Sequence, residues 1–124
     1  MGERICLIVD DEPAIRTYLR VVLNGEGFRC LEAGSAVESL RILQKEGNQI
    51  DLLITDVRML GDMDGIDLAH AVKDSHPSLP VILVSGYAGR NPGGFHFVQK
   101  PFMPDAIVKA IDNAMTGLVP ASAR

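Results

Sequence analysis

Five short apolar runs alternate with segments of helical periodicity, and no other feature constrains the fold of this chain as strongly. The runs are almost continuously hydrophobic, as expected of strands covered on both faces. They span residues 4–9, 28–33, 50–55, 81–84 and 95–99. Strands that alternate with helices build right-handed βαβ units. The sequence therefore predicts an α/β protein with a parallel five-stranded sheet and helices on both sides.

Capping residues and glycines mark the ends of four expected helices. The helices run from Pro13 to the Asn-Gly pair at 24–25, from Ser35 to Gly47, from Ile66 to the residue before His76, and from Pro104 to Ala114. Ser35 followed three residues later by Glu38 fits a capping box. Proline and acidic residues suit the first turn of a helix, which supports the starts of the first and last helices.

The segment between the fourth and fifth runs lacks the residues of a helix. Residues 86–94 contain four glycines and a proline, and both residue types disfavour helix strongly. We expect the fourth helix of a regular alternation to be missing or reduced to a single turn. The 124 residues are the size of one domain, which we place at 1–117, with 118–124 as a tail or linker stump.

Composition excludes several classes of function. Twelve Lys and Arg against sixteen Asp and Glu give a net charge of -4, which argues against direct nucleic acid binding. No apolar run approaches the roughly 18 residues of a membrane span, and the N-terminus lacks a signal peptide, so we expect a cytoplasmic protein without a membrane partner. Scattered histidines and two isolated cysteines give no zinc spacing.

Polar and charged residues follow the apolar runs directly. They are Asp10 and Asp11, Asp56, Ser85 and Lys100. The carboxyl ends of parallel strands meet at one edge of the sheet, where ligands bind in such folds. Carboxylates held close together repel one another unless a cation neutralises them, and Mg2+ suits such oxygen ligands. The turn after the first run has no glycine-rich phosphate loop, so NAD, FAD and ATP are not expected.

Four motifs in order resemble the receiver domain of two-component response regulators over nearly the whole chain. They are Leu7-Ile-Val-Asp-Asp-Glu12, Leu53-Ile-Thr-Asp-Val-Arg-Met59 with Asp64-Gly65, Val84-Ser-Gly86 and Gln99-Lys-Pro-Phe102. The resemblance implies a flavodoxin-like, doubly wound sheet of order 2-1-3-4-5, here with helix 4 shortened or missing. The loop from Asp56 to Gly65 resembles that of receivers attached to hybrid histidine kinases, with Leu60 where the family usually has proline.

The resemblance implies a phosphorylation site and a metal site that share one aspartate. Asp56 matches the phospho-acceptor. Asp10 and Asp11 match the acidic pair that holds Mg2+ together with Asp56, and the backbone carbonyl of Arg58 would be a further ligand. The phosphoryl donor would be a phosphohistidine on a histidine kinase or a histidine phosphotransfer protein. The downstream target is a protein that the sequence does not identify.

Further roles follow from the same resemblance. Lys100 would pair with the aspartyl phosphate, and Ser85 would bind a phosphoryl oxygen and act as a switch together with Phe97, which stands where the family usually has tyrosine. Arg58 and Tyr87 flank the acceptor and would set how fast the phosphoryl group is lost. We expect residues 86–94 to be mobile in the free domain and to become ordered on phosphorylation.

Two other functions compete with a phosphorylated signalling module. The shortened segment favours a receiver-like protein interaction domain that is never phosphorylated, but all five site residues are present. A magnesium-dependent phosphohydrolase would need a further acid to protonate its leaving group, and no spare Glu or His follows a strand. The chain is thus expected to catalyse only its own phosphorylation and slow autodephosphorylation, and not to be an enzyme acting on other substrates.

Overall fold

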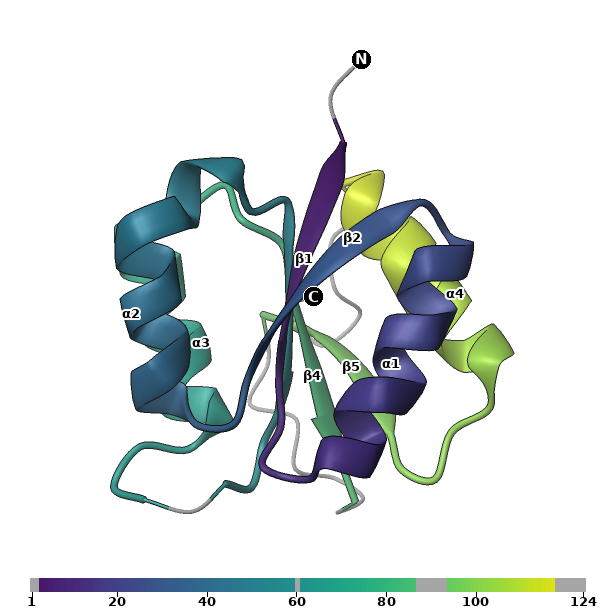
Figure 1. Cartoon of the computed structure of the whole chain (residues 1–124), viewed down its shortest axis with the longest axis horizontal. Coiled ribbons are helices and arrows are strands. Elements are labelled where there is room, and N and C mark those ends of the chain that lie inside the picture. Colours follow the sequence, from purple (N-terminus) through teal and green to yellow (C-terminus); the bar gives the residue numbers. More distant parts are fainter. Residues whose placement is uncertain (1–2, 60, 87–93, 118–124) are drawn as a thin grey trace.

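Five parallel strands form the central sheet in the order β2-β1-β3-β4-β5 (Figure 1). The structure is a computed structural model that describes residues 3–59, 61–86 and 94–117. The strands are β1 (Arg4–Val9), β2 (Phe28–Ala33), β3 (Leu52–Asp56), β4 (Val81–Ser85) and β5 (His96–Gln99). The predicted fold class and the predicted strand order are confirmed.

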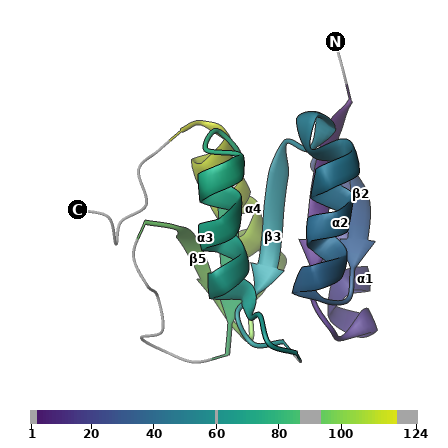
Figure 2. The same ribbon diagram turned by 90° about the vertical axis from the view of Figure 1, so that its left-hand side faces the viewer.

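Helices cover both faces of the sheet, as Figures 1 and 2 show from two sides. One layer contains α1 (Pro13–Gly25) and α4 (Pro104–Met115), and the other contains α2 (Ala36–Glu46) and α3 (Gly65–Ser75), with a short 3-10 turn η1 (Gly47–Gln49) after α2. These are the four α-helices of the described residues. The connection between β4 and β5 includes residues 87–93, which lie outside the described residues, so a shortened fourth helix there stays a prediction.

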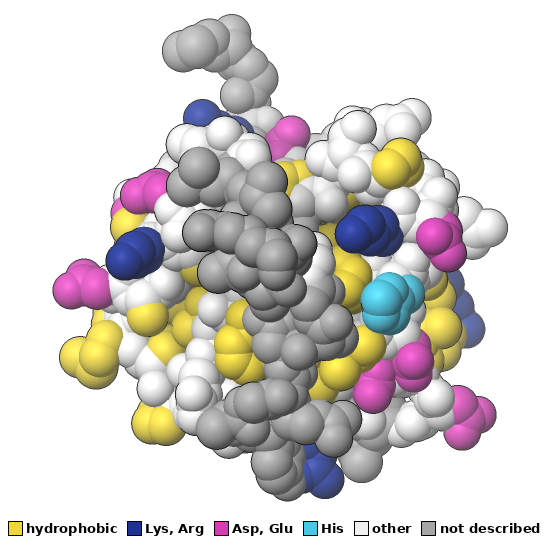
Figure 3. All heavy atoms as spheres, turned by 180° about the vertical axis from the view of Figure 1, so that it is seen from behind, with side chains coloured by type: hydrophobic (Ala, Val, Ile, Leu, Met, Phe, Trp, Pro, Cys, Tyr) yellow, Lys and Arg dark blue, Asp and Glu magenta, His cyan; other side chains and the backbone are white. Residues whose placement is uncertain are grey.

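The alternation of side chains along each strand explains why the runs are apolar throughout. In β1, Cys6 and Ile8 pack on the layer of α1 and α4, whereas Leu7 and Val9 pack on the layer of α2 and α3. All four side chains are at most 1% exposed. On the face opposite to that of Figure 1, hydrophobic and charged side chains are interspersed (Figure 3). Two hydrophobic cores thus hold the sheet from both sides.

The helix starts agree with the predicted caps except in one bond. The Ser35 hydroxyl accepts from the backbone N–H of Glu38 at 3.1 Å, as predicted. The Glu38 carboxylate, however, accepts from the backbone N–H of Gly34 at 2.6 Å, so the reciprocal bond of the box goes one residue further back. Asp64 and Asp67 form a complete capping box at the start of α3, which the sequence analysis did not anticipate.

Two strands begin later than the sequence predicts. Ile50 lies before β3 because its N–H closes the 3-10 turn on the carbonyl of Gly47 at 3.2 Å, and β5 begins at His96 rather than Phe95. The expected tail at 118–124 lies outside the described residues. In the described part of the chain, no helix combines the length and the hydrophobicity needed to cross a bilayer.

Candidate functional site

The carboxyl ends of four strands bring the predicted site residues to one edge of the sheet. Asp10 directly follows β1, Asp56 and Ser85 end β3 and β4, and Lys100 directly follows β5. The parallel register places Asp56 beside Val84 and Ser85 beside Gln99. Residues up to 90 positions apart in the chain therefore converge.

Three carboxylates form a cluster at this edge. One oxygen each from Asp10, Asp11 and Asp56 lies within 4.8 Å of the others. Asp10 and Asp56 are only 1% and 7% exposed. An all-oxygen donor set with three negative charges fits a hard divalent cation such as Mg2+, which binds through carboxylates, carbonyls and water. The predicted metal ligands Asp10, Asp11 and Asp56 are thus brought together.

Lys100 bridges two of these carboxylates. Its Nζ lies 3.5 Å from Oδ2 of Asp10 and 3.5 Å from Oδ1 of Asp56. Its backbone N–H donates to the carbonyl of Ser85 at 2.7 Å, and the peptide bond that follows, to Pro101, is cis. The lysine is thus anchored at its backbone while its ammonium group offsets part of the acidic charge.

Burial and mutual repulsion perturb the carboxyl groups. The pKa of Asp56 is raised to about 6, mainly by burial and also by the neighbouring Asp10, although Lys100 acts in the opposite direction. Burial also raises the pKa of Asp10, against the lowering effects of the Glu12 backbone N–H and of Lys100. Asp56 therefore carries its full charge only above about pH 6 when no cation is bound.

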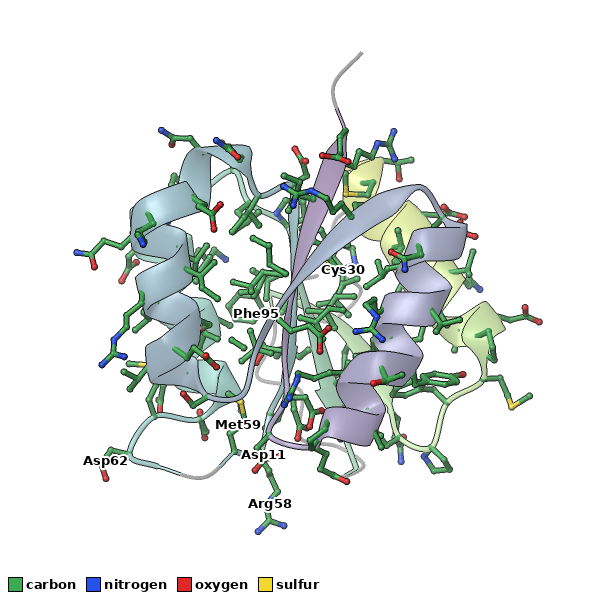
Figure 4. All side chains as sticks on the ribbon, viewed as in Figure 1. Asp11, Cys30, Arg58, Met59, Asp62 and Phe95 are labelled. Carbon is green, nitrogen blue, oxygen red and sulfur yellow. The ribbon has the colours of Figure 1, made fainter. Side chains whose placement is uncertain are left out.

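The acidic cluster opens into a cleft of about 390 Å³. Its lining consists of Asp11, Glu12, Asp56, Arg58, Met59, Gly86 and Lys100. In Figure 4 the side chains of Asp11, Arg58 and Met59 lie at the same edge, and Arg58 points outward (Figure 4). The sequence analysis assigned no role to Glu12 or Met59, although both belong to motifs that it quoted.

The remaining predicted residues lie in different surroundings. Ser85 is buried at the end of β4, next to the cleft-lining Gly86. Phe97 is partly buried against the core cluster on the side of α2 and α3 and is not among the residues that line the cleft. Tyr87 and Leu60 lie outside the described residues. The structure thus places Ser85 at the site edge and Phe97 behind it.

Gly65 lets α3 begin directly against the end of β3, where Asp56 lies. A Cβ atom at Gly65 would lie 1.9 Å from the backbone oxygen of Asp56 and 2.9 Å from the Cα atom of Val57. The N–H of Gly65 donates to the carbonyl of Val57 at 2.8 Å. Only glycine fits such a close approach of two backbones. The Asp64-Gly65 motif alone does not predict this contact.

The family is decided by a match over most of the chain. Residues 6–112 match the family described as the response regulator receiver domain. The chain belongs to this family. The family assignment agrees with the fold that the sequence motifs predict for this receiver domain.

Individual relatives support the assignment. The receiver domain is 36% identical over 123 residues to the transcriptional regulatory protein GlrR of Escherichia coli, a match that covers 94% of this chain and 27% of GlrR. It is 36% identical over 108 residues to the sensor kinase CckA of Brucella abortus, covering 82% of this chain and 11% of CckA. It thus spans about a quarter of GlrR and about a tenth of CckA.

Solved structures share the same architecture. The crystal structure of a response regulator receiver domain protein from Clostridium thermocellum superimposes with a TM-score of 0.82 at 30% identity. The superposition covers 92% of this chain and 95% of that one. The likeness therefore extends over nearly the full length of both chains.

Proposed function

We propose that this receiver domain accepts a phosphoryl group on the carboxylate of Asp56. The observation that carries the proposal is the position of Asp56, which ends a buried strand, faces an open cleft and lies 3.5 Å from the ammonium group of Lys100. A carboxylate nucleophile with cationic neighbours is what phosphoryl transfer to a protein requires. The family membership supports the same reaction.

The acidic cluster supports a role for Mg2+ in this reaction. Asp10, Asp11 and Asp56 would hold the ion through their carboxylates, and Arg58 through its backbone carbonyl. When bound, Mg2+ neutralises charge on the phosphoryl oxygens and on the carboxylates. The raised pKa of Asp56 fits this arrangement, because a group that is costly to ionise alone is stabilised as an anion by a nearby cation.

The transfer step uses the chain's own residues. A carboxylate oxygen of Asp56 forms a bond to phosphorus while the phosphorus–nitrogen bond of a phosphohistidine breaks, and the electron pair returns to the imidazole of the donor. Lys100 and Ser85 bind phosphoryl oxygens. In our proposal Arg58 and Tyr87 control the access of water, which sets the rate of autodephosphorylation, and Phe97 transmits the change from Ser85 to a partner surface.

An apolar recess next to the cleft is suited to the phosphohistidine donor, a histidine kinase or a phosphotransfer protein. The recess measures about 530 Å³ and is lined by Ile15, Tyr18, Gly86, Lys100, Pro101 and Phe102. It shares Gly86 and Lys100 with the acidic cleft. A donor seated there would present its phosphorylated ring directly to Asp56.

We also propose the extent of the domain and the kind of partner on which it acts. GlrR and CckA are several times longer than this chain, so their activities are not transferred to it. We propose residues 1–117 as the receiver domain and 118–124 as a tail. The chain would act in the cytoplasm on a protein partner, with no direct binding of nucleic acid or membrane.

A small phosphodonor tests the proposed function. Incubation of the protein with acetyl phosphate and Mg2+ should add the mass of one phosphoryl group, and chelation of the metal should prevent the addition. Asp56→Asn should leave the fold intact and abolish the addition, because the amide is nearly isosteric but a poor nucleophile. Asp62→Asn is the matched control, since Asp62 lies away from the cleft on an exposed loop and should retain full phosphorylation.

The same experiment separates the competing functions. No mass change in the wild-type protein would favour an unphosphorylated interaction domain. Continuous release of phosphate without an adduct would favour a phosphohydrolase. Unchanged modification of the Asp56→Asn variant would exclude Asp56 as the acceptor.

A further inference from the structure

Arg16 in α1 contacts the backbone of the turn that carries the acidic pair. Its Nη1 donates to the backbone carbonyl of Asp10 at 2.7 Å, and its Nε pairs with Glu32 of β2 at 3.2 Å. We infer that Arg16 is a positioning residue for the metal site and holds Asp10 and Asp11 in the geometry that binds the cation. The inference rests on the proposed function and assigns a role to a residue outside the cleft lining.

Asp10 is held at each of its polar groups by a different part of the fold. Its N–H donates to the carbonyl of Ala33 at 3.1 Å, its Oδ1 accepts from the N–H of Glu12 at 2.9 Å, and its Oδ2 lies 3.5 Å from Lys100. The residue is 1% exposed. In this buried setting the carbonyl needs a partner, and Arg16 supplies one.

The contact with the Asp10 carbonyl also fixes Asp11. The carbonyl oxygen of Asp10 and the nitrogen and Cα atoms of Asp11 lie in one peptide plane. A bond that holds this oxygen therefore sets the direction in which the chain enters Asp11. Arg16 thus acts on two of the three clustered carboxylates without touching either side chain.

Glu32 holds the guanidinium group in place. It accepts from Arg16 through Oε1 and from Arg20 through Oε2, the latter at 2.8 Å. The Arg16 side chain is 21% exposed. Because Arg16 uses two different nitrogens for the carbonyl and for Glu32, a lysine with its single nitrogen cannot reproduce both contacts. Arg20 shares Glu32 but makes no hydrogen bond to the acidic turn in the described part of the chain, which makes it a matched comparison.

Electrostatics alone predicts the opposite effect of removing Arg16. A cation near the acidic cluster repels Mg2+, so its loss should strengthen metal binding. A positioning role predicts weaker binding, because the ligands lose their fixed geometry. The sign of the change in affinity therefore separates a positioning role from a mere charge effect.

The test compares the Mg2+ affinity of variants of the whole chain, measured from the backbone amide shifts of Asp10 and Asp11 during titration. Arg16→Gln and Arg16→Lys should weaken binding about tenfold, as is common for residues that orient metal ligands. Arg20→Gln, which removes a cation from the same carboxylate, should leave the affinity unchanged or slightly higher. Ile111→Val, in the remote core of α4, controls for loss of stability and should not alter the affinity.

Two results would overturn the inference. Unchanged or tighter binding in the Arg16 variants would show that Arg16 does not position the ligands, and an equal loss in Arg20→Gln would assign the effect to charge on Glu32. Should Arg16→Gln fail to fold, Arg16→Lys carries the same test, because it keeps a cation at this position of α1 while it changes the geometry of the two contacts. Failure of the proposed function is distinct, since the wild-type protein would then not be phosphorylated, whatever the order of the Mg2+ affinities.

Discussion

Asp56 combines two properties that oppose each other in the unmodified protein. In the proposed reaction it must be ionised to attack phosphorus, yet its burial and the neighbouring carboxylate of Asp10 raise its pKa to about 6. Lys100 offsets this only in part, from 3.5 Å. Without a bound cation, the buried charge of Asp56 therefore lowers the stability of the folded protein.

The raised pKa of Asp56 predicts how the stability of the metal-free protein depends on pH. An unfolded aspartate titrates near pH 3.9, whereas folded Asp56 titrates at about 6. Between these values the folded state binds more protons than the unfolded state, so the contribution of Asp56 to stability falls as pH rises. The full penalty above about pH 6 is about 2 to 3 kcal/mol at 1.36 kcal/mol per pKa unit.

Asp56→Asn removes this penalty and supplies the measurement. Chemical denaturation in chelator should show that the variant exceeds the wild type in free energy of unfolding, and that the excess grows from pH 4 to pH 7. Asp62→Asn, on an exposed loop, should show no such trend. An excess that is constant with pH would mean that Asp56 is ionised equally in the folded and unfolded states.

At the scale of elements, the start of α3 limits which side chains fit beside Asp56. The capping box of Asp64 and Asp67 begins the helix, and Gly65 brings its first turn against the backbone of Asp56. Part of the geometry at Asp56 is therefore set by a helix that contributes no predicted ligand.

Gly65→Ala should disturb the acceptor strand. The added methyl group would meet backbone atoms of Asp56 and Val57, which cannot rotate away as a side chain can. We expect a loss of at least about 2 kcal/mol in the free energy of unfolding, in the range of overpacked sites, together with slower phosphorylation. The measurements are denaturant unfolding and the rate of modification by acetyl phosphate.

Gly25→Ala is the matched control for this substitution. A Cβ atom at Gly25, the last residue of α1, would meet nothing within 4 Å, and alanine favours helix over glycine by up to about 1 kcal/mol. The control should be neutral or stabilising. A Gly65→Ala protein as stable as the control would show that α3 can shift away from β3 without cost.

Local signals in the sequence predicted most of the elements, and contacts between elements account for only part of what was missed. The apolar runs and Ser35 as a cap were correct because propensity and tertiary structure agree there. The start of β3 depends on a local 3-10 turn that Ile50 closes. The role of Gly65 and the contact of Arg16 with the Asp10 carbonyl depend on how a helix meets the end of a neighbouring strand. Strand-end positions predicted that Asp10, Asp56 and Lys100 meet, but not that Phe97 lies outside the cleft lining.

At the scale of the whole molecule, the site exists only when the sheet is assembled. Asp10, Asp56 and Lys100 follow or end three different strands, β1, β3 and β5, and lie next to one another only because the strand order places these strands in one sheet. An unfolded chain has no such cluster. Whatever binds the cluster must therefore stabilise the entire fold.

Magnesium should accordingly raise the stability of the whole domain. For a ligand that binds only the folded state, the gain is RT ln(1 + [L]/Kd), or about 2.7 kcal/mol at a concentration of 100 Kd. The melting temperature should thus rise with the logarithm of the Mg2+ concentration once it exceeds Kd. Asp11→Asn, which removes one charge from the cluster, should weaken the rise. NaCl at matched ionic strength controls for screening of the carboxylates, and an equal rise in NaCl would exclude a specific site for the metal.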